Sequence, residues 1–181
     1  MPVRTFSLTL KTVPPVAKRK KHVLILLHDQ NNHYLLGTKD VYPPGIYRMV
    51  GGGMEKGETP LQSAVRELHE ELQIAVPEED LQVLGTVVTH IASGEEKFIF
   101  TSHIFFLELK DHGIVPNDDL DGVVHIDPID CEGLLQRYKL LSPVIDYVHK
   151  FSWFDYGQIY GPIHAFAFQQ AKKITYAHSI L

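Results

Sequence analysis

A glycine turn followed by one arginine and four glutamates constrains this chain more than any other feature. The turn is Gly51–Gly53, and the charged residues follow it at Glu58, Arg66, Glu67, Glu70 and Glu71. Carboxylates packed so closely repel one another, and a hard cation such as Mg²⁺ makes the cluster tolerable. An E-x-x-E-E run alone would indicate a solvated helix face. The added glycine turn and Arg66 favour a metal site.

The segment after the turn has the pattern of an amphipathic helix. Thr59 is suited to the N-cap and Pro60 to the first helical position, so a helix is predicted from Pro60 to about Gln73. At about 100° per residue, the apolar side chains form one stripe and the three clustered glutamates occupy an arc of roughly 100° on the other side. The stripe consists of Leu61, Ala64, Val65, Leu68 and Leu72.

Residues 52–74 resemble the Nudix box, G-x5-E-x7-R-E-U-x-E-E-x-G-U, where U is aliphatic. The matching positions are Gly52, Glu58, Arg66, Glu67, Leu68, Glu70, Glu71 and Ile74. Gln73 stands where the family usually has glycine. A left-handed helix end would cost glutamine roughly 1 kcal/mol, so the match departs from the family at the end of this helix and not at its carboxylates.

The resemblance implies a Mg²⁺ site, with Mn²⁺ as a substitute. By this resemblance Glu70 and Glu71 are metal ligands, Glu67 is a ligand or the group that activates water, and Arg66 braces the loop by pairing with Glu58. A backbone carbonyl, with Gly51 as the best candidate, completes the site. Some relatives use a base outside the box, for which the candidates are Glu95, Glu96, Asp118, Asp119 and Asp121.

The implied activity is hydrolysis of a diphosphate linkage in a nucleoside diphosphate derivative, a small nucleotide-type substrate. The proline typical of ADP-ribose hydrolases is missing at Val88–His90, and the tyrosine typical of dinucleoside polyphosphate hydrolases is missing at Ile91–Ser93. The upstream pattern of coenzyme A hydrolases is also not visible. A nucleoside triphosphate or another nucleotide sugar stays open.

Two other classes of function remain as alternatives. Some Nudix-like domains are catalytically weak nucleotide sensors, but those commonly lose box carboxylates, which are all present here. Isopentenyl-diphosphate isomerases share the fold and use a cysteine ahead of the box. The single cysteine of this chain, Cys131, follows the box.

Composition supports an ordinary globular enzyme. The chain has 181 residues, of which 44% are hydrophobic and 22% charged, so it is long enough to bury a core. Its net charge of −5 argues against a general nucleic-acid binder. The lone cysteine, the lack of an apolar run of membrane-spanning length, and a start without a signal-peptide segment together predict a cytoplasmic protein with no membrane contact.

Hydrophobic patterns divide the chain into elements. Strands are predicted at residues 5–12, Val23–Leu27, Tyr34–Thr38, Ile46–Val50, Leu81–Ile91, Lys97–Leu109 and Val123–Ile126, and helices at Leu134–Tyr138 and Pro143–Phe151. Strands on both sides of a helix predict an α/β fold with a mixed sheet sandwiched between helices, which is also the Nudix fold. The basic run Lys18–Lys21 could attract phosphates, but the favoured interpretation is a solvated tether.

Three regions are expected. Residues 1–19 form an N-terminal extension with a short strand, residues 20–150 form the Nudix domain, and residues 151–181 form an aromatic-rich C-terminal extension. In the last region Pro162 is predicted to open a helix that runs through Lys173. Its aromatic side chains are expected to pack on the domain itself or on a partner subunit in a homodimer.

Overall fold

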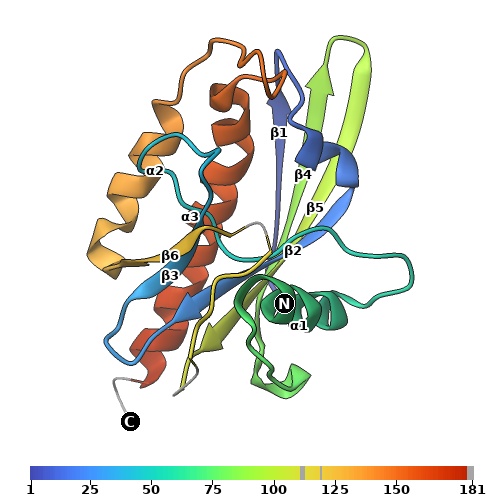
Figure 1. Cartoon of the computed structure of the whole chain (residues 1–181). Coiled ribbons are helices and arrows are strands. Elements are labelled where there is room, and N and C mark those ends of the chain that lie inside the picture. The colour runs from blue at the N-terminus through green and yellow to red at the C-terminus, as the bar shows by residue number, and fades with distance from the viewer. Residues whose placement is uncertain (111–112, 119, 179–181) are drawn as a thin grey trace.

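A computed structural model describes residues 1–110, 113–118 and 120–178 of the chain (Figure 1). The strands are β1 (Val3–Thr9), β2 (Lys21–His28), β3 (Tyr34–Thr38), β4 (Gln82–Ser93), β5 (Glu96–Glu108) and β6 (Gly122–Ile126). The α-helices are α1 (Pro60–Leu72), α2 (Cys131–Lys139) and α3 (Trp153–His178), and short 3-10 helices are η1 (Pro15–Arg19), η2 (Glu78–Asp80) and η3 (Pro128–Asp130).

The six strands form one mixed sheet in the order β1-β4-β5-β2-β3-β6. β1 is parallel to β4 and β2 is parallel to β5, while the β4–β5, β2–β3 and β3–β6 pairs are antiparallel. The long central strands β2, β4 and β5 therefore carry the sheet, and β3 and β6 extend it on the side of the glycine turn.

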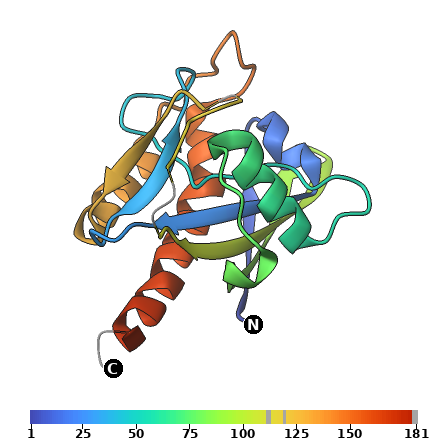
Figure 2. The ribbon, with the colours of Figure 1, turned by 60° about the horizontal axis from the view of Figure 1, so that its bottom comes forward.

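Helices cover both faces of the sheet, as predicted. On β2 the side chains of Val23, Ile25 and Leu27 pack with α1, whereas Leu24 and Leu26 pack with α3. This alternation is the period-2 consequence of strand geometry, and burial on both faces explains why β2 is a continuous apolar run. Figure 2 shows α1 and α3 on opposite sides of the strands. The predicted sandwich of a mixed sheet between helices is confirmed.

Helix α1 begins and ends as its local sequence indicates. The Thr59 hydroxyl accepts a hydrogen bond from the Gln62 N–H, and the Gln62 side chain accepts one from the Thr59 N–H, which completes a capping box. Gln73 adopts the left-handed conformation with φ 55° and ψ 28°, a conformation that glycine would adopt at lower cost. The Gln73 N–H donates to the carbonyls of His69 and Leu68, and the Ile74 N–H donates to the Leu68 carbonyl, so backbone groups at the end of the helix find partners.

The strand predicted at Ile46–Val50 is wrong. This segment crosses two strands and makes one isolated bridge to each, from Arg48 to Gly37 of β3 and from Val50 to Ile25 of β2. A segment that changes partner after one bridge cannot build a ladder. Instead, this segment connects Pro43 and Pro44 to the glycine turn.

The helix predicted at Pro143–Phe151 is also wrong. The Asp146 carboxylate accepts hydrogen bonds from the N–H groups of Val148 and His149, and Lys150 has a positive φ of 63°. These contacts form a turn that competes with a helix. The apolar pattern was misleading because Val144, Tyr147 and Val148 are 67%, 85% and 82% exposed.

Helix α3 begins before the predicted start at Pro162. The Ser152 hydroxyl accepts the Asp155 N–H as an N-cap, and the helix then continues through Pro162 to His178. Proline removes a hydrogen bond inside a helix, but Pro162 faces solvent while Tyr160 and Ile163 beside it are fully buried. Packing therefore overrides the proline. No helix in the described ranges has the length and apolar character needed to cross a membrane.

The contact between α2 and α3 depends on Gly157. A Cβ at this position would lie 2.3 Å from the Tyr138 carbonyl oxygen, so Gly157→Ala should force the helices apart and lower the free energy of unfolding by about 1–3 kcal/mol. Gly133 on α2 has open space around it, so Gly133→Ala should be neutral or stabilising by up to about 1 kcal/mol. Urea denaturation measures both. Equal effects of the two substitutions would contradict the close approach.

Candidate active site

The glycine turn lies directly against the carboxylates of α1. A Cβ on Gly52 would lie 2.6 Å from Glu67 Oε1, and a Cβ on Gly51 would lie 2.3 Å from the Val23 carbonyl oxygen. Gly51 also has a positive φ of 130°, and its N–H donates to Glu71 Oε2 at 2.7 Å. The glycines are thus needed for the close approach that covers Glu67 and Glu71.

Arg66 joins the loop to the helix. Its guanidinium donates to Glu58 at 2.7 and 3.1 Å, to the Gly53 carbonyl at 3.0 Å, to Glu67 at 2.9 Å and to Glu70 at 2.7 Å. The pairing with Glu58 is the one expected from the sequence. A planar fork with several donors suits this role, and lysine would not reproduce it.

The carboxylates of the site differ in pKa because some are buried and others are not. Burial raises the pKa of Glu71 to about 7, although Arg48, the Gly51 N–H and Lys39 oppose this shift. Burial also raises the pKa of Glu67, whereas hydrogen bonds from Arg66 lower the pKa of Glu58 to about 2. Glu67 and Glu71 therefore lie where a negative charge needs a further positive partner.

A pocket of about 270 Å³ joins these groups to residues from other elements. Its lining consists of Val16, Arg19, Lys39, Arg48, Gly51, Gly52, Glu67, Glu70, Glu71 and Asp118. Oxygen donors at this density match the preference of Mg²⁺ or Mn²⁺, so the residues present fit the cation that the box implies. Glu67, Glu70, Glu71 and the Gly51 carbonyl are the groups that would hold it.

Three cationic residues line the pocket, and of these only Arg19 was considered from the sequence, as part of a run that could attract phosphates. Arg19 ends η1, Lys39 follows β3, and Arg48 precedes the glycine turn. Arg19 belongs to the run interpreted as a solvated tether, and that interpretation is wrong for Arg19, because η1 folds it back over the pocket. The sequence offered one signal for these three cations: each lies beside an element that borders the glycine turn.

Helix α3 supports the glycine turn from behind. Arg48 donates to the Gly51 carbonyl at 2.8 Å, and its guanidinium lies 5.6 Å from the centre of the Tyr160 ring. The Met49 N–H donates to His164 Nε2 at 3.0 Å, while His164 Nδ1 contacts the Tyr160 carbonyl at 2.8 Å. Residues of the aromatic C-terminal region thus hold the backbone that carries Gly51.

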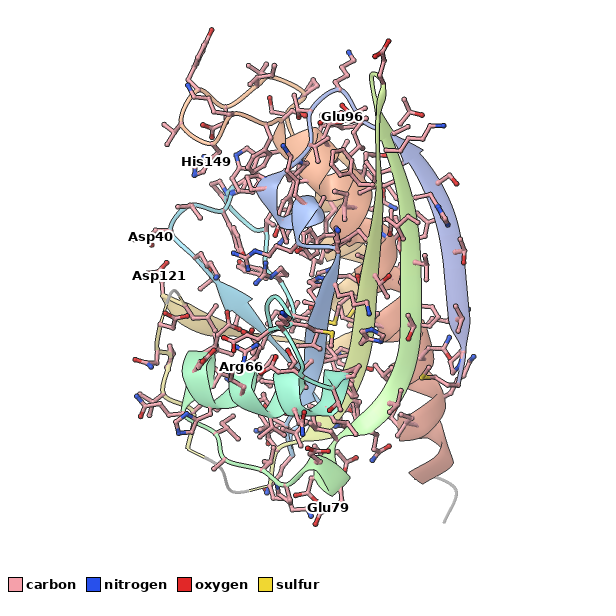
Figure 3. All side chains as sticks on the ribbon, turned by 90° about the vertical axis from the view of Figure 1, so that its right-hand side faces the viewer. Asp40, Arg66, Glu79, Glu96, Asp121 and His149 are labelled. Atoms are coloured by element: carbon pink, nitrogen blue, oxygen red, sulfur yellow. The ribbon has the colours of Figure 1, made fainter. Side chains whose placement is uncertain are left out.

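The acidic residues outside the box occupy different places. Asp118 lines the pocket, whereas Asp121 accepts a hydrogen bond from the Asp40 N–H. Glu95 and Glu96 lie at the tip of the β4–β5 hairpin, far from Arg66, as the labels in Figure 3 show for Glu96. Asp119 lies outside the described residues.

Comparisons with known proteins bear on the same region. The family model of the NUDIX domain matches residues 18–139, and no curated protein sequence matches the chain. The solved structure of the E. coli dihydroneopterin triphosphate pyrophosphohydrolase is similar, with a TM-score of 0.51 and 24% identity, over 69% of this chain and 88% of that one. A Nudix hydrolase from M. smegmatis, RenU, has a TM-score of 0.51 and 21% identity over 88% and 87% of the two chains. The MutT protein from Bacillus halodurans has a TM-score of 0.52 and 20% identity over 63% and 72%. These structures share the fold.

The raised pKa of Glu71 predicts a pH-dependent stability. Folding raises this pKa from its ordinary value of 4.5 to about 7, so the folded, metal-free protein holds the proton more tightly than the unfolded chain. The resulting stabilisation is complete below pH 4.5 and is lost as the pH rises through 7. Relative to Glu71→Gln, the wild type should lose roughly 1–3 kcal/mol of unfolding free energy between pH 4.5 and 8. Urea denaturation in EDTA measures this, and parallel pH profiles would contradict it.

Proposed function

The chain belongs to the Nudix family of pyrophosphohydrolases, and we propose that it hydrolyses a diphosphate linkage in a nucleoside diphosphate derivative with Mg²⁺ as cofactor. One observation carries the proposal. A single pocket contains the box carboxylates Glu67, Glu70 and Glu71 together with the cations Arg19, Lys39 and Arg48. Carboxylates alone bind metals, and cations alone bind phosphates, but the two together suit a phosphate chain that binds with a metal ion.

The box residues have two proposed roles, which are metal binding and positioning of the metal-binding carboxylates. Glu70 and Glu71 would hold the metal with Glu67 and the Gly51 carbonyl, and Mg²⁺ would offset phosphate charge and lower the pKa of a bound water. Arg66 fixes Glu58, Glu67 and Glu70 in one arrangement, so the carboxylates need not reorganise when substrate binds. The cations orient the phosphate oxygens.

We propose Asp118 as the general base. Among the described acidic residues outside the box that the sequence nominated, it is the one that lines the pocket. Glu67 is the other candidate, but its Oε1 already accepts a hydrogen bond from Arg66 at 2.9 Å. Asp118 is exposed and takes no part in that network, so its carboxylate is accessible to a water next to the phosphates.

The isomerase alternative finds no support in the pocket. Cys131 begins α2 and is buried in the cluster on the α3 side of the sheet, where burial raises the pKa of its thiol to about 12. It does not line the pocket that contains the box glutamates. A nucleoside triphosphate and a nucleotide sugar are the substrate classes we propose to test first.

A screen of nucleoside triphosphates and nucleotide sugars with Mg²⁺ tests the proposed activity. We expect hydrolysis that stops in EDTA, and a loss of several orders of magnitude in kcat for Glu71→Gln, which keeps the size of the side chain and removes a metal-binding charge. Reaction in ¹⁸O-water should place the label on a phosphate product. Label in a sugar hydroxyl, or full activity of a folded Glu71→Gln protein, would refute the proposal.

Substitution of Asp118 tests the assignment of the base. Asn also tolerates the left-handed backbone of this residue, which has a φ of 56°, so Asp118→Asn should fold normally. We expect kcat to fall by about 10²–10⁴-fold with little change in KM. Glu96→Gln at the hairpin tip is the matched control and should leave both constants unchanged. If Asp118→Asn keeps the wild-type kcat, the base is a different group.

A further inference from the structure

Three potential metal ligands converge at the β2–β3 turn. Asp29 and His33 belong to this turn, and His125 comes from β6, the edge strand that pairs with β3. Asp29 Oδ2 lies 3.0 Å from His125 Nδ1 and 3.4 Å from His33 Nδ1. The three ligand atoms all lie within 4.8 Å of one another. Two imidazoles therefore face one carboxylate oxygen.

The turn holds the carboxylate in this orientation. Asp29 Oδ1 accepts hydrogen bonds from the N–H groups of Asn31 at 2.9 Å and His33 at 2.8 Å. These bonds occupy Oδ1 and turn Oδ2 toward the imidazoles. On the other side, the β3–β6 register sets His125 opposite Leu35, two residues after His33. The turn and the β3–β6 pairing thus hold the three side chains together, in the way that hydrogen bonds to metal-ligating side chains orient them.

From this geometry we propose that Asp29, His33 and His125 bind a divalent transition-metal ion of the Zn²⁺ type. Zinc takes nitrogen ligands at about 2.0–2.1 Å and carboxylate oxygens at about 2.0–2.2 Å, so tetrahedral ligands lie about 3.3–3.5 Å apart. The two separations from Asp29 Oδ2 are within a few tenths of an ångström of that spacing. The side chains of His33 and His125 are 37% and 56% exposed, which leaves room for a water as the fourth ligand.

This site is separate from the box site in position and in chemistry. His33 immediately precedes β3, while Lys39 of the catalytic pocket immediately follows it, so the two sites lie about 20 Å apart at opposite ends of the strand. Two imidazole nitrogens select a borderline transition metal, whereas the all-oxygen ligand set of Glu67, Glu70, Glu71 and the Gly51 carbonyl selects Mg²⁺. A bound ion would tie the edge strand β6 to the β2–β3 turn and stabilise the sheet without entering the reaction.

Titration of the metal-free full-length protein with Zn²⁺ tests the site. Excess Mg²⁺ is kept in the buffer to occupy the box carboxylates. We expect one tight Zn²⁺ equivalent and a rise in Tm with Zn²⁺. Asp29→Asn preserves the acceptor for the turn and removes the charge, and His125→Ala removes a ligand from the exposed edge strand. Each should weaken Zn²⁺ binding by at least about tenfold and abolish the rise in Tm.

Two control proteins identify the source of any binding. His90→Ala removes an exposed histidine on β4, and Glu71→Gln alters the box site, and both should bind Zn²⁺ as the wild type does. The proposal is overturned if the wild type shows no tight equivalent, if Asp29→Asn and His125→Ala bind Zn²⁺ normally, or if binding is lost only in Glu71→Gln. In the absence of a metal the same residues would serve only as a hydrogen-bonded turn.

Discussion

The close approach of the glycine turn to α1 is the constraint on which the rest of the site depends. Gly51 donates its N–H to Glu71 at 2.7 Å, and Gly52 leaves only enough room for the Glu67 carboxylate. The backbone of the turn therefore covers the carboxylates of Glu67 and Glu71 and shields them from water. Burial raises the pKa of both groups, although the Gly51 N–H by itself lowers the pKa of Glu71, and the same contact shapes the pocket. The Arg66 network and the strands beneath serve to keep turn and helix at this separation.

The two faces of the sheet contribute differently to the site. The α1 face supplies the carboxylates, and the α3 face supplies the support for the loop that passes over them. Arg48 connects the two, because it lines the pocket, holds the Gly51 carbonyl and lies over the Tyr160 ring. A helix outside the range matched by the family model thus takes part in shaping the pocket that contains the box carboxylates.

Local signals made α1 and most strands predictable. Thr59, Gln62 and Pro60 act within one turn of the helix, and the alternation along β4 and β5 reflects only strand geometry. Two errors arose where distant contacts decide: Ile46–Val50 changes strand partner, and packing of Tyr160 carries α3 through Pro162. The third was local, because the Asp146 carboxylate forms a turn with the next few residues where the apolar pattern indicated a helix. Likewise, spacing placed the glutamates on one arc, but only the folded loop shows that Glu67 and Glu71 are buried.

The support that α3 gives to the glycine turn has a consequence for the order of events during synthesis. His164, which accepts the Met49 N–H, lies 115 residues later in the chain. A ribosome therefore releases the turn and the whole box helix long before their support exists. Until α3 docks, the nascent chain carries closely spaced carboxylates on a loosely held loop, and the apolar face of the sheet that α3 covers is open to chaperones. The competent pocket is thus a late product of folding, although its signature lies in the first half of the sequence.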